Sequence, residues 1–104
     1  MQGALTRNGS LDGRAAFDID LPDDCRMTTK GFMVDYQVFK VTCGKGDYAG
    51  VYVGNFGDET VPRSRTLRTQ FGWPTQVQVW SNIVPGDQAR ADAIAASVRL
   101  RALK

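Results

Sequence analysis

Two runs rich in valine and aromatic residues dominate the middle of the chain, and a glycine-rich connection separates them. The runs are Phe32–Cys43 and Tyr48–Phe56, and residues 44–47 between them read Gly-Lys-Gly-Asp. A short connection of this kind between two such runs is typical of a β-hairpin. The sequence therefore predicts an antiparallel hairpin of two long strands. A plain four-residue loop would place Phe39 opposite Tyr52.

The second run carries no charge on either of its faces. A strand with two uncharged, largely apolar faces is expected in the middle of a sheet, covered on both sides. Gly50 and Gly54 flank Tyr52 on one of these faces. Glycine inside a strand often marks a place where another group comes close. We therefore expect a helix or an aromatic ring to lie against this glycine face.

The length of the first run determines whether the two cysteines, Cys25 and Cys43, can form a disulfide. If Phe32–Cys43 is one straight strand, Cys43 lies ~36 Å from its start, and the segment from Cys25 to Gly31 can retrace only ~20 Å. A disulfide therefore requires this strand to be bent or shorter. The apolar residues change faces near Val38, which indicates a bulge, a strong twist or an outer half covered on both faces. A disulfide, two unlinked thiols and a functional thiol stay open as alternatives, and a disulfide would indicate an oxidising compartment.

The segment before the hairpin has one clear strand. Arg14–Leu21 alternates apolar and polar residues, which predicts a half-exposed strand that Pro22 ends. Asp23–Lys30 is expected to be a loop. Met1–Gly13 contains turn dipeptides and no apolar leader, so we expect a flexible segment there, either a cytosolic start or the start of a mature exported protein.

After the hairpin, Val61–Trp73 is expected to be a basic connection of low periodicity. Gln76–Ile83 alternates again and predicts a strand with Trp80 on its Gln76 and Gln78 face. Asp87 is the expected N-cap of a helix. The helix would bury a stripe at helical spacing, consisting of Ala91, Ile94, Ala95 and Val98. Beyond Val98 the pattern fits either a frayed helix end or a short strand.

These elements predict one α+β domain over residues 14–104. Its fold would be a layered sandwich, in which a C-terminal helix packs on a central, mostly antiparallel sheet. Tyr36, Tyr48 and Tyr52 are expected in the core with their hydroxyls hydrogen-bonded at its edge. No apolar run is long enough to span a membrane.

The amino-acid composition excludes some kinds of active site but does not identify a function. The chain has 104 residues and no histidine, which removes histidine-activated nucleophiles and histidine metal ligands. Residues 1–60 carry six basic and nine acidic side chains, whereas residues 61–104 carry seven and two. This charge asymmetry can orient a partner. We expect no enzymatic activity and no cofactor.

An acidic cluster and a basic cluster are the two charged candidate sites. The acidic one lacks the spacing and the glycine of a calcium loop, so we expect a solvated face and turn rather than a metal site. Its members are Asp18, Asp20, Asp23 and Asp24. The basic one consists of Arg63, Arg65 and Arg68, whose guanidinium groups suit an acidic protein or a small anion. The modest net charge of +2 argues against nucleic acid.

Four stretches together resemble a family of small exported bacterial proteins with a PsbP-like α/β/α sandwich. They are Leu21-Pro22, the run Val-Asp-Tyr-Gln-Val-Phe at 34–39, the run Gly-Val-Tyr-Val-Gly-Asn at 50–55, and the helix at 91–98. Some of these proteins are immunity or accessory proteins of secretion systems. The resemblance implies a central antiparallel sheet, a periplasmic location and no catalytic residues. This chain departs from it at Cys25, where an aromatic residue is usual.

We therefore expect a non-enzymatic interaction domain of the bacterial envelope, periplasmic or secreted, that binds a protein partner. The surface would be the Val61–Trp73 connection and the exposed side of the Gln76–Asn82 strand. The expected contact residues are Arg63, Arg65, Arg68, Trp73, Trp80, Asn55 and Phe56. The alternative is a carrier of a small molecule or lipid, with a pocket between sheet and helix lined by Tyr52, Val53, Ile94 and Val98.

Overall fold

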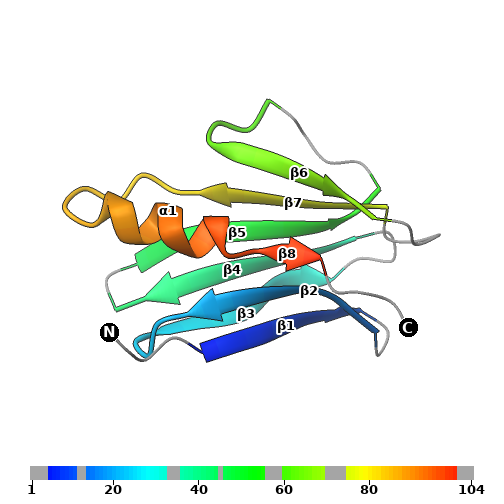
Figure 1. Cartoon of the computed structure of the whole chain (residues 1–104), viewed down its shortest axis with the longest axis horizontal. Helices are drawn as coiled ribbons and strands as arrows, with labels where there is room; N and C mark the ends of the chain where they lie inside the picture. Colours follow the sequence, from blue (N-terminus) through cyan, green and yellow to red (C-terminus); the bar gives the residue numbers. More distant parts are fainter. Residues whose placement is uncertain are drawn as a thin grey trace.

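The structure is a computed structural model, and it describes residues 5–11, 14–32, 36–44, 46–55, 60–69 and 75–100. These residues form eight strands and one helix (Figure 1). The elements are β1 (Leu5–Leu11), β2 (Arg14–Leu21), β3 (Cys25–Phe32), β4 (Gln37–Cys43), β5 (Gly46–Gly54), β6 (Ser64–Arg68), β7 (Gln76–Ser81), α1 (Gln88–Ala96) and β8 (Arg99–Leu100).

The strands form two antiparallel sheets. One has five strands in the order β3-β4-β5-β7-β6, and the other has three in the order β1-β2-β8. The small sheet and α1 lie on the same side of the large sheet (Figure 1). The rings of Phe17 in β2 and Phe39 in β4 meet across this interface at 5.4 Å, edge to face. The core therefore lies between the five-stranded sheet and a mixed layer of strands and helix.

The two faces of the five-stranded sheet differ in what covers them. We call the face under β2 and α1 the inner face, and its residues are almost all buried. They include Phe39, Val41, Cys43, Ala49, Val51, Val53, Val77 and Val79. We call the opposite face the outer face, and none of the described helices or strands packs on it. Its residues include Val38, Lys40, Thr42, Gly50, Tyr52, Gly54, Ser64, Thr66, Gln76, Gln78 and Trp80.

The predicted central position of the strand after the glycine turn is confirmed, whereas the expected cover on both faces is wrong for the described elements, which cover its inner face only. β5 lies third of five in its sheet, and Val51 and Val53 are fully buried on its inner face. On its outer face, the ring of Trp80 lies so close to Gly50 that a Cβ added there would overlap the ring atoms. The expected aromatic ring against the glycine face is therefore the Trp80 indole.

The predicted register of the central hairpin is wrong by one residue. Phe39 pairs with Val51 rather than Tyr52, and Val38 pairs with Tyr52. Two features cause this. The strands stay paired up to Cys43 and Gly46, so the connection is shorter than four residues, and a bulge between Val41 and Thr42 then shifts the register back by one residue. A bulge places an extra residue in one strand, and the hydrophobic pattern alone does not locate it.

The prediction of one long strand from Phe32 to Cys43 is also wrong. Phe32 ends β3 and Gln37 begins β4, and the two strands pair as neighbours. Residues 23–30, expected to be a loop, are mostly strand because β3 begins at Cys25. The shorter strands bring the cysteines directly opposite each other, with 4.0 Å between their Cα atoms and a disulfide joining them. Among the alternatives that the sequence left open, the structure has the bridged one.

Two further segments differ from expectation. Within Met1–Gly13, expected to be flexible, Leu5–Leu11 forms β1 along the full length of β2. Within Val61–Trp73, expected to be irregular, Ser64–Arg68 forms β6 at the edge of the large sheet. Both strands have few apolar residues, so periodicity gave no sign of them.

The remaining elements agree better with the sequence. The strands at Arg14–Leu21 and Gln76–Ser81 are present, and the helix begins after Asp87. Its predicted stripe is buried, namely Ala91, Ile94, Ala95 and Val98. Of the two alternatives beyond Val98, the structure has the short strand, β8, which pairs with β2.

The expected fold class needs correction. Strands dominate the described part of the chain and the one helix there spans nine residues, so the domain is β-rich with a short C-terminal helix, not a balanced α+β layered sandwich. Part of the second layer is a small sheet where the α/β/α resemblance implied helices. Across the described ranges, no helix has the length and apolar character needed to cross a membrane.

Candidate binding surfaces

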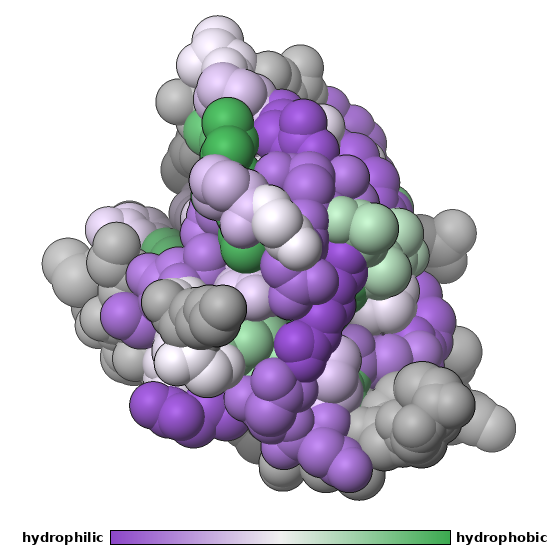
Figure 2. Space-filling model, turned by 90° about the vertical axis from the view of Figure 1, so that its left-hand side faces the viewer, coloured by the Kyte–Doolittle hydropathy of each residue, from purple (hydrophilic) through white to green (hydrophobic). Residues whose placement is uncertain are grey.

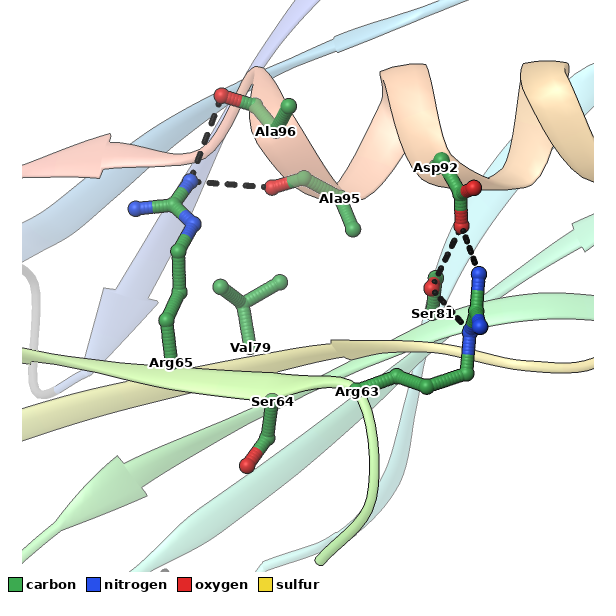
Figure 3. Close-up of a pocket in the computed structure, with 8 residues that line it drawn as sticks. All are labelled: Arg63, Ser64, Arg65, Val79, Ser81, Asp92, Ala95 and Ala96. Atoms are coloured by element: carbon green, nitrogen blue, oxygen red, sulfur yellow. Dashed lines mark hydrogen bonds and ion pairs between the residues drawn. The ribbon is translucent and has the colours of Figure 1, made fainter.

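The predicted arginine cluster lies along the edge strand β6 and divides between two sides of the sheet. Arg65 pairs with the inner-face residue Val79, and its side chain reaches α1. Arg63 precedes β6 with φ of 62°, a left-handed conformation that is uncommon for a residue other than glycine. Ser64 points away from the helix (Figure 3). Arg68 is exposed and pairs with Gln76 at the far end of the strand.

Arg63 joins the edge of the sheet to the middle of the helix. Its Nη2 donates to Asp92 Oδ1 at 2.8 Å and its Nε donates to Ser81 Oγ at 3.3 Å. Ser81 also donates to the same carboxylate, at 2.8 Å. The Arg63 hydrogen bond, with smaller contributions from Ser81 and Gln88, lowers the pKa of the Asp92 carboxyl below its usual value. This arginine therefore already has a carboxylate partner within the domain.

Arg65 holds the other end of the helix. Its Nη2 donates to the carbonyl oxygens of Ala95, Ala96 and Val98 at 3.0, 3.2 and 2.9 Å. Ala95 and Ala96 end α1, where a helix carries partial negative charge, and Val98 follows the helix. Arg65 thus closes the helix from a strand 30 positions earlier in the chain.

A pocket of about 320 Å³ lies between the two arginines. Arg63 and Arg65 stand at its two ends, with Val79 between them and the helix above (Figure 3). Ala95 and Ala96 complete the apolar part of its lining. The predicted contact residues Arg63 and Arg65 therefore come together, but on the helix side of β6 and not on the outer face.

The other predicted contact residues do not join this pocket. Trp80 lies on the outer face, partly buried, with its ring over Gly50. Asn55 follows the end of β5, where its Oδ1 accepts hydrogen bonds from Thr75 N at 3.1 Å and Thr75 Oγ1 at 3.0 Å. This contact ties the end of β5 to the start of β7, which is a structural role. Phe56 and Trp73 lie outside the described residues.

The outer face carries an aromatic group that sequence reasoning assigned to the core. Tyr52 and Tyr36 lie 5.7 Å apart between ring centroids, and a Cβ at Gly54 would meet both. Tyr36 is 37% exposed, whereas Tyr52 is half-buried. Together with Trp80 they form what we call the aromatic strip, Tyr36, Tyr52 and Trp80. The signal was available in Gly50 and Gly54, since a ring that lies over a glycine need not be in the core.

Tyr48 agrees with the expectation of a core tyrosine bonded at its edge. It is 4% exposed, and its hydroxyl donates to Asp87 Oδ2 at 2.7 Å. The Asp87 hydrogen bond and burial raise the pKa of the Tyr48 phenol. Arg90 stacks over the Tyr48 ring at 5.7 Å and forms an ion pair with Asp24, which lowers the pKa of the Asp24 carboxyl.

These side chains line a second pocket, of about 300 Å³, where α1 begins. Figure 2 shows this end of the molecule, which is mainly hydrophilic with small hydrophobic spots. Two members of the predicted acidic cluster form ion pairs, Asp24 with Arg90 and Asp20 with Arg99. Within the described ranges, no group of three histidine, cysteine or acidic residues is placed to hold a metal ion.

The pocket predicted for a small molecule or lipid is not formed by its four residues. Val53, Ile94 and Val98 belong to the buried core. Tyr52 is adjacent to Val53 in β5 and therefore points to the opposite face of the sheet. The four side chains cannot line one cavity.

Comparisons of the chain with protein-family models, curated proteins and solved structures found no match.

Proposed function

We propose that the chain is a non-enzymatic interaction domain of the bacterial envelope that binds a protein partner on the outer face of its five-stranded sheet. The observation that carries this proposal is the aromatic strip, Tyr36, Tyr52 and Trp80. Its rings lie on a face that no described element covers, yet they are only partly exposed. Tyrosine and tryptophan are the residues most enriched in the energetically important centres of protein interfaces.

The surroundings of the strip suit a protein partner. Thr66 and Gln76 lie beside it on β6 and β7, and Lys40 lies on β4. Interfaces commonly combine an aromatic centre with a polar rim of this kind. Arg68 stands at the same end of the sheet as Gln76 and adds an exposed positive charge. The proposed surface therefore includes Trp80 and Arg68, which the sequence analysis expected as contact residues. It also includes Tyr36 and Tyr52, which were expected in the core.

Two other features support the remaining parts of the proposal. The Cys25–Cys43 disulfide fits an oxidising compartment such as the periplasm or the exterior of the cell. The carboxyl groups of Asp24 and Asp92 have pKa values lowered by arginines. Carboxyls that serve in general acid–base catalysis usually have raised pKa values, so these two are better suited to structural ion pairs.

Position-dependent photo-cross-linking in the producing cells tests the proposal. A photoreactive amino acid replaces Thr66 on the outer face and, as a matched control, Ala89 on the exposed side of α1. We expect one protein adduct of discrete mass from position 66 and none from position 89. In the position 66 background, Tyr36→Ser should reduce the adduct several-fold while the circular dichroism spectrum stays unchanged. Equal adducts from both positions, or none from position 66, would contradict the proposal.

A further inference from the structure

The pocket between β6 and α1 combines an apolar floor with positive charge that the described residues neutralise only in part. Val79 is 1% exposed and forms the floor, with the methyl groups of Ala95 and Ala96 beside it. Among the described residues, no carboxylate forms an ion pair with Arg65. Its hydrogen bonds to these residues all run from Nη2 to main-chain carbonyl groups.

The hydrogen-bond capacity of the two arginines is only partly used. A guanidinium group has five N–H donors, and Arg65 engages one of its three nitrogens with the described residues. Its Nε and Nη1 donors therefore have no acceptor in the described part of the protein. Arg63 engages Nε and Nη2 with the same part of the chain and leaves Nη1. Donors thus remain at both ends of the pocket.

The charge balance favours a monoanion. The pocket contains two guanidinium groups and one carboxylate, Asp92, which is paired with Arg63. The end of α1 adds about half a negative charge. The balance is about half a positive charge, which suits a singly charged carboxylate better than a doubly charged phosphate.

We propose that this pocket binds a carboxylate carried on a short apolar stem. The carboxylate accepts hydrogen bonds from Arg65 Nε or Nη1, and the stem lies on Val79 and Ala95. A volume of about 320 Å³ is at the lower end of known ligand pockets, so a small acid or a single acidic side chain fits. The same chemistry can come from a free organic acid or from a glutamate side chain of a peptide segment.

Methyl chemical shifts of Val79 and Ala95 give a direct measurement. Isovalerate is the main probe, isovaleramide is its neutral isostere, and inorganic phosphate tests a bare anion. We expect saturable shifts with millimolar isovalerate, at least about tenfold weaker with the amide, and none with phosphate. Glutamate blocked at both termini, which keeps only its side-chain carboxylate, separates the two sources: tighter binding than isovalerate indicates a peptide, and weaker binding indicates a free acid.

Variants connect the shifts to the pocket. Ala96→Leu extends an exposed side chain into the pocket and should abolish isovalerate binding, whereas Ala89→Leu, about two turns earlier on the same side of α1 and outside the pocket lining, should leave it unchanged. Arg65→Lys keeps a charge at the helix end but loses the planar fork, so binding should weaken several-fold. Equal shifts with acid and amide, binding that survives Ala96→Leu, or no shift with either carboxylate would overturn the proposal. None of these outcomes depends on the outer face.

Discussion

The space beside β5 is filled in different ways on the two faces of the five-stranded sheet. On the inner face of β5, Val51 and Val53 fill the space with their own side chains and are fully buried. On the outer face of the same strand, Gly50 leaves space that the ring of Trp80 fills from the neighbouring strand. The difference shows how a sheet can hold large aromatic rings in fixed positions without enclosing them in a core.

The largest expected difference in stability is between removing an aromatic ring from the inner face and removing one from the outer face. Phe39→Ala removes an inner-face ring that contacts Phe17 in β2, and should destabilise the domain by about 3–5 kcal/mol. Tyr36→Ala, on the outer side, should cost under about 1 kcal/mol. Urea unfolding of both variants measures the difference, and equal costs would show that the outer face is also covered.

The disulfide provides the second comparison. Replacing Cys25 and Cys43 by alanine should cost about 3 kcal/mol for a closed loop of this size. The outer-face pair one step along the same strands is Arg26 and Thr42, and replacing both by alanine should change stability by less than about 0.5 kcal/mol. Thermal melting with and without reductant checks this. Reductant should lower the melting temperature of the natural chain and leave that of the double alanine variant unchanged.

A double-mutant cycle tests the glycine–ring pair directly. Gly50→Ala should cost about 1–3 kcal/mol, because the three atoms nearest the new methyl group all belong to the Trp80 ring. In a Trp80→Ala background the same change should become neutral or stabilise by up to about 1 kcal/mol, since alanine restricts the unfolded chain more than glycine does. Additive effects of the two substitutions would contradict the close approach.

The smallest effect concerns the ion pairs that attach α1 to the inner-face side. The pKa values of Asp24 and Asp92 are lowered in the folded protein, so both carboxylates stabilise it above their unfolded pKa of about 4. That contribution is lost as the pH falls through the lower folded values. We expect the melting temperature to fall below about pH 4, and to fall less in Asp92→Asn. An acid limb unchanged in Asp92→Asn and Asp24→Asn would contradict this assignment.

The sequence predicted the elements whose pattern is set by the core. Arg14–Leu21 alternates because every second side chain faces the core, and Phe17, Ile19 and Leu21 are all fully buried. The stripe on α1 is legible for the same reason. The spacing of apolar residues along the chain indicates which positions are buried. It therefore predicts the strands that contribute many residues to the core.

The strands that periodicity missed contribute little to the core. In β6, Leu67 is the one aliphatic side chain and is only partly buried. In β3, Cys25 and Met27 face inward but alternate with Arg26 and threonines, which we interpreted as a loop. If cysteine is counted as apolar, apolar and polar residues alternate from Cys25 to Thr28, and this alternation indicates a strand. Pairing that strand with the next one would have placed Cys25 opposite Cys43.

The sequence predicted which arginines belong to the candidate site, but not how they are arranged in the structure. Arginines around residue 65 were recognised as unusual, but sequence alone gave no sign that they reach α1 some 30 positions later. Guanidinium groups look the same in sequence whether they bind a helix end or a partner. The contacts of Arg63 and Arg65 with α1 depend on β6 lying at the sheet edge, which is a property of the whole topology.

The attachments of α1 have a consequence for how the domain folds. Nine residues are too few for a helix to persist alone in water, and the Asp87 carboxylate bonds to Tyr48 and not to the helix backbone. Side chains from β5 and the β6 edge therefore hold this helix at both of its ends. It should exchange its amide hydrogens in step with β6, so that this helix and the edge strand that Arg65 belongs to open and close as a single unit.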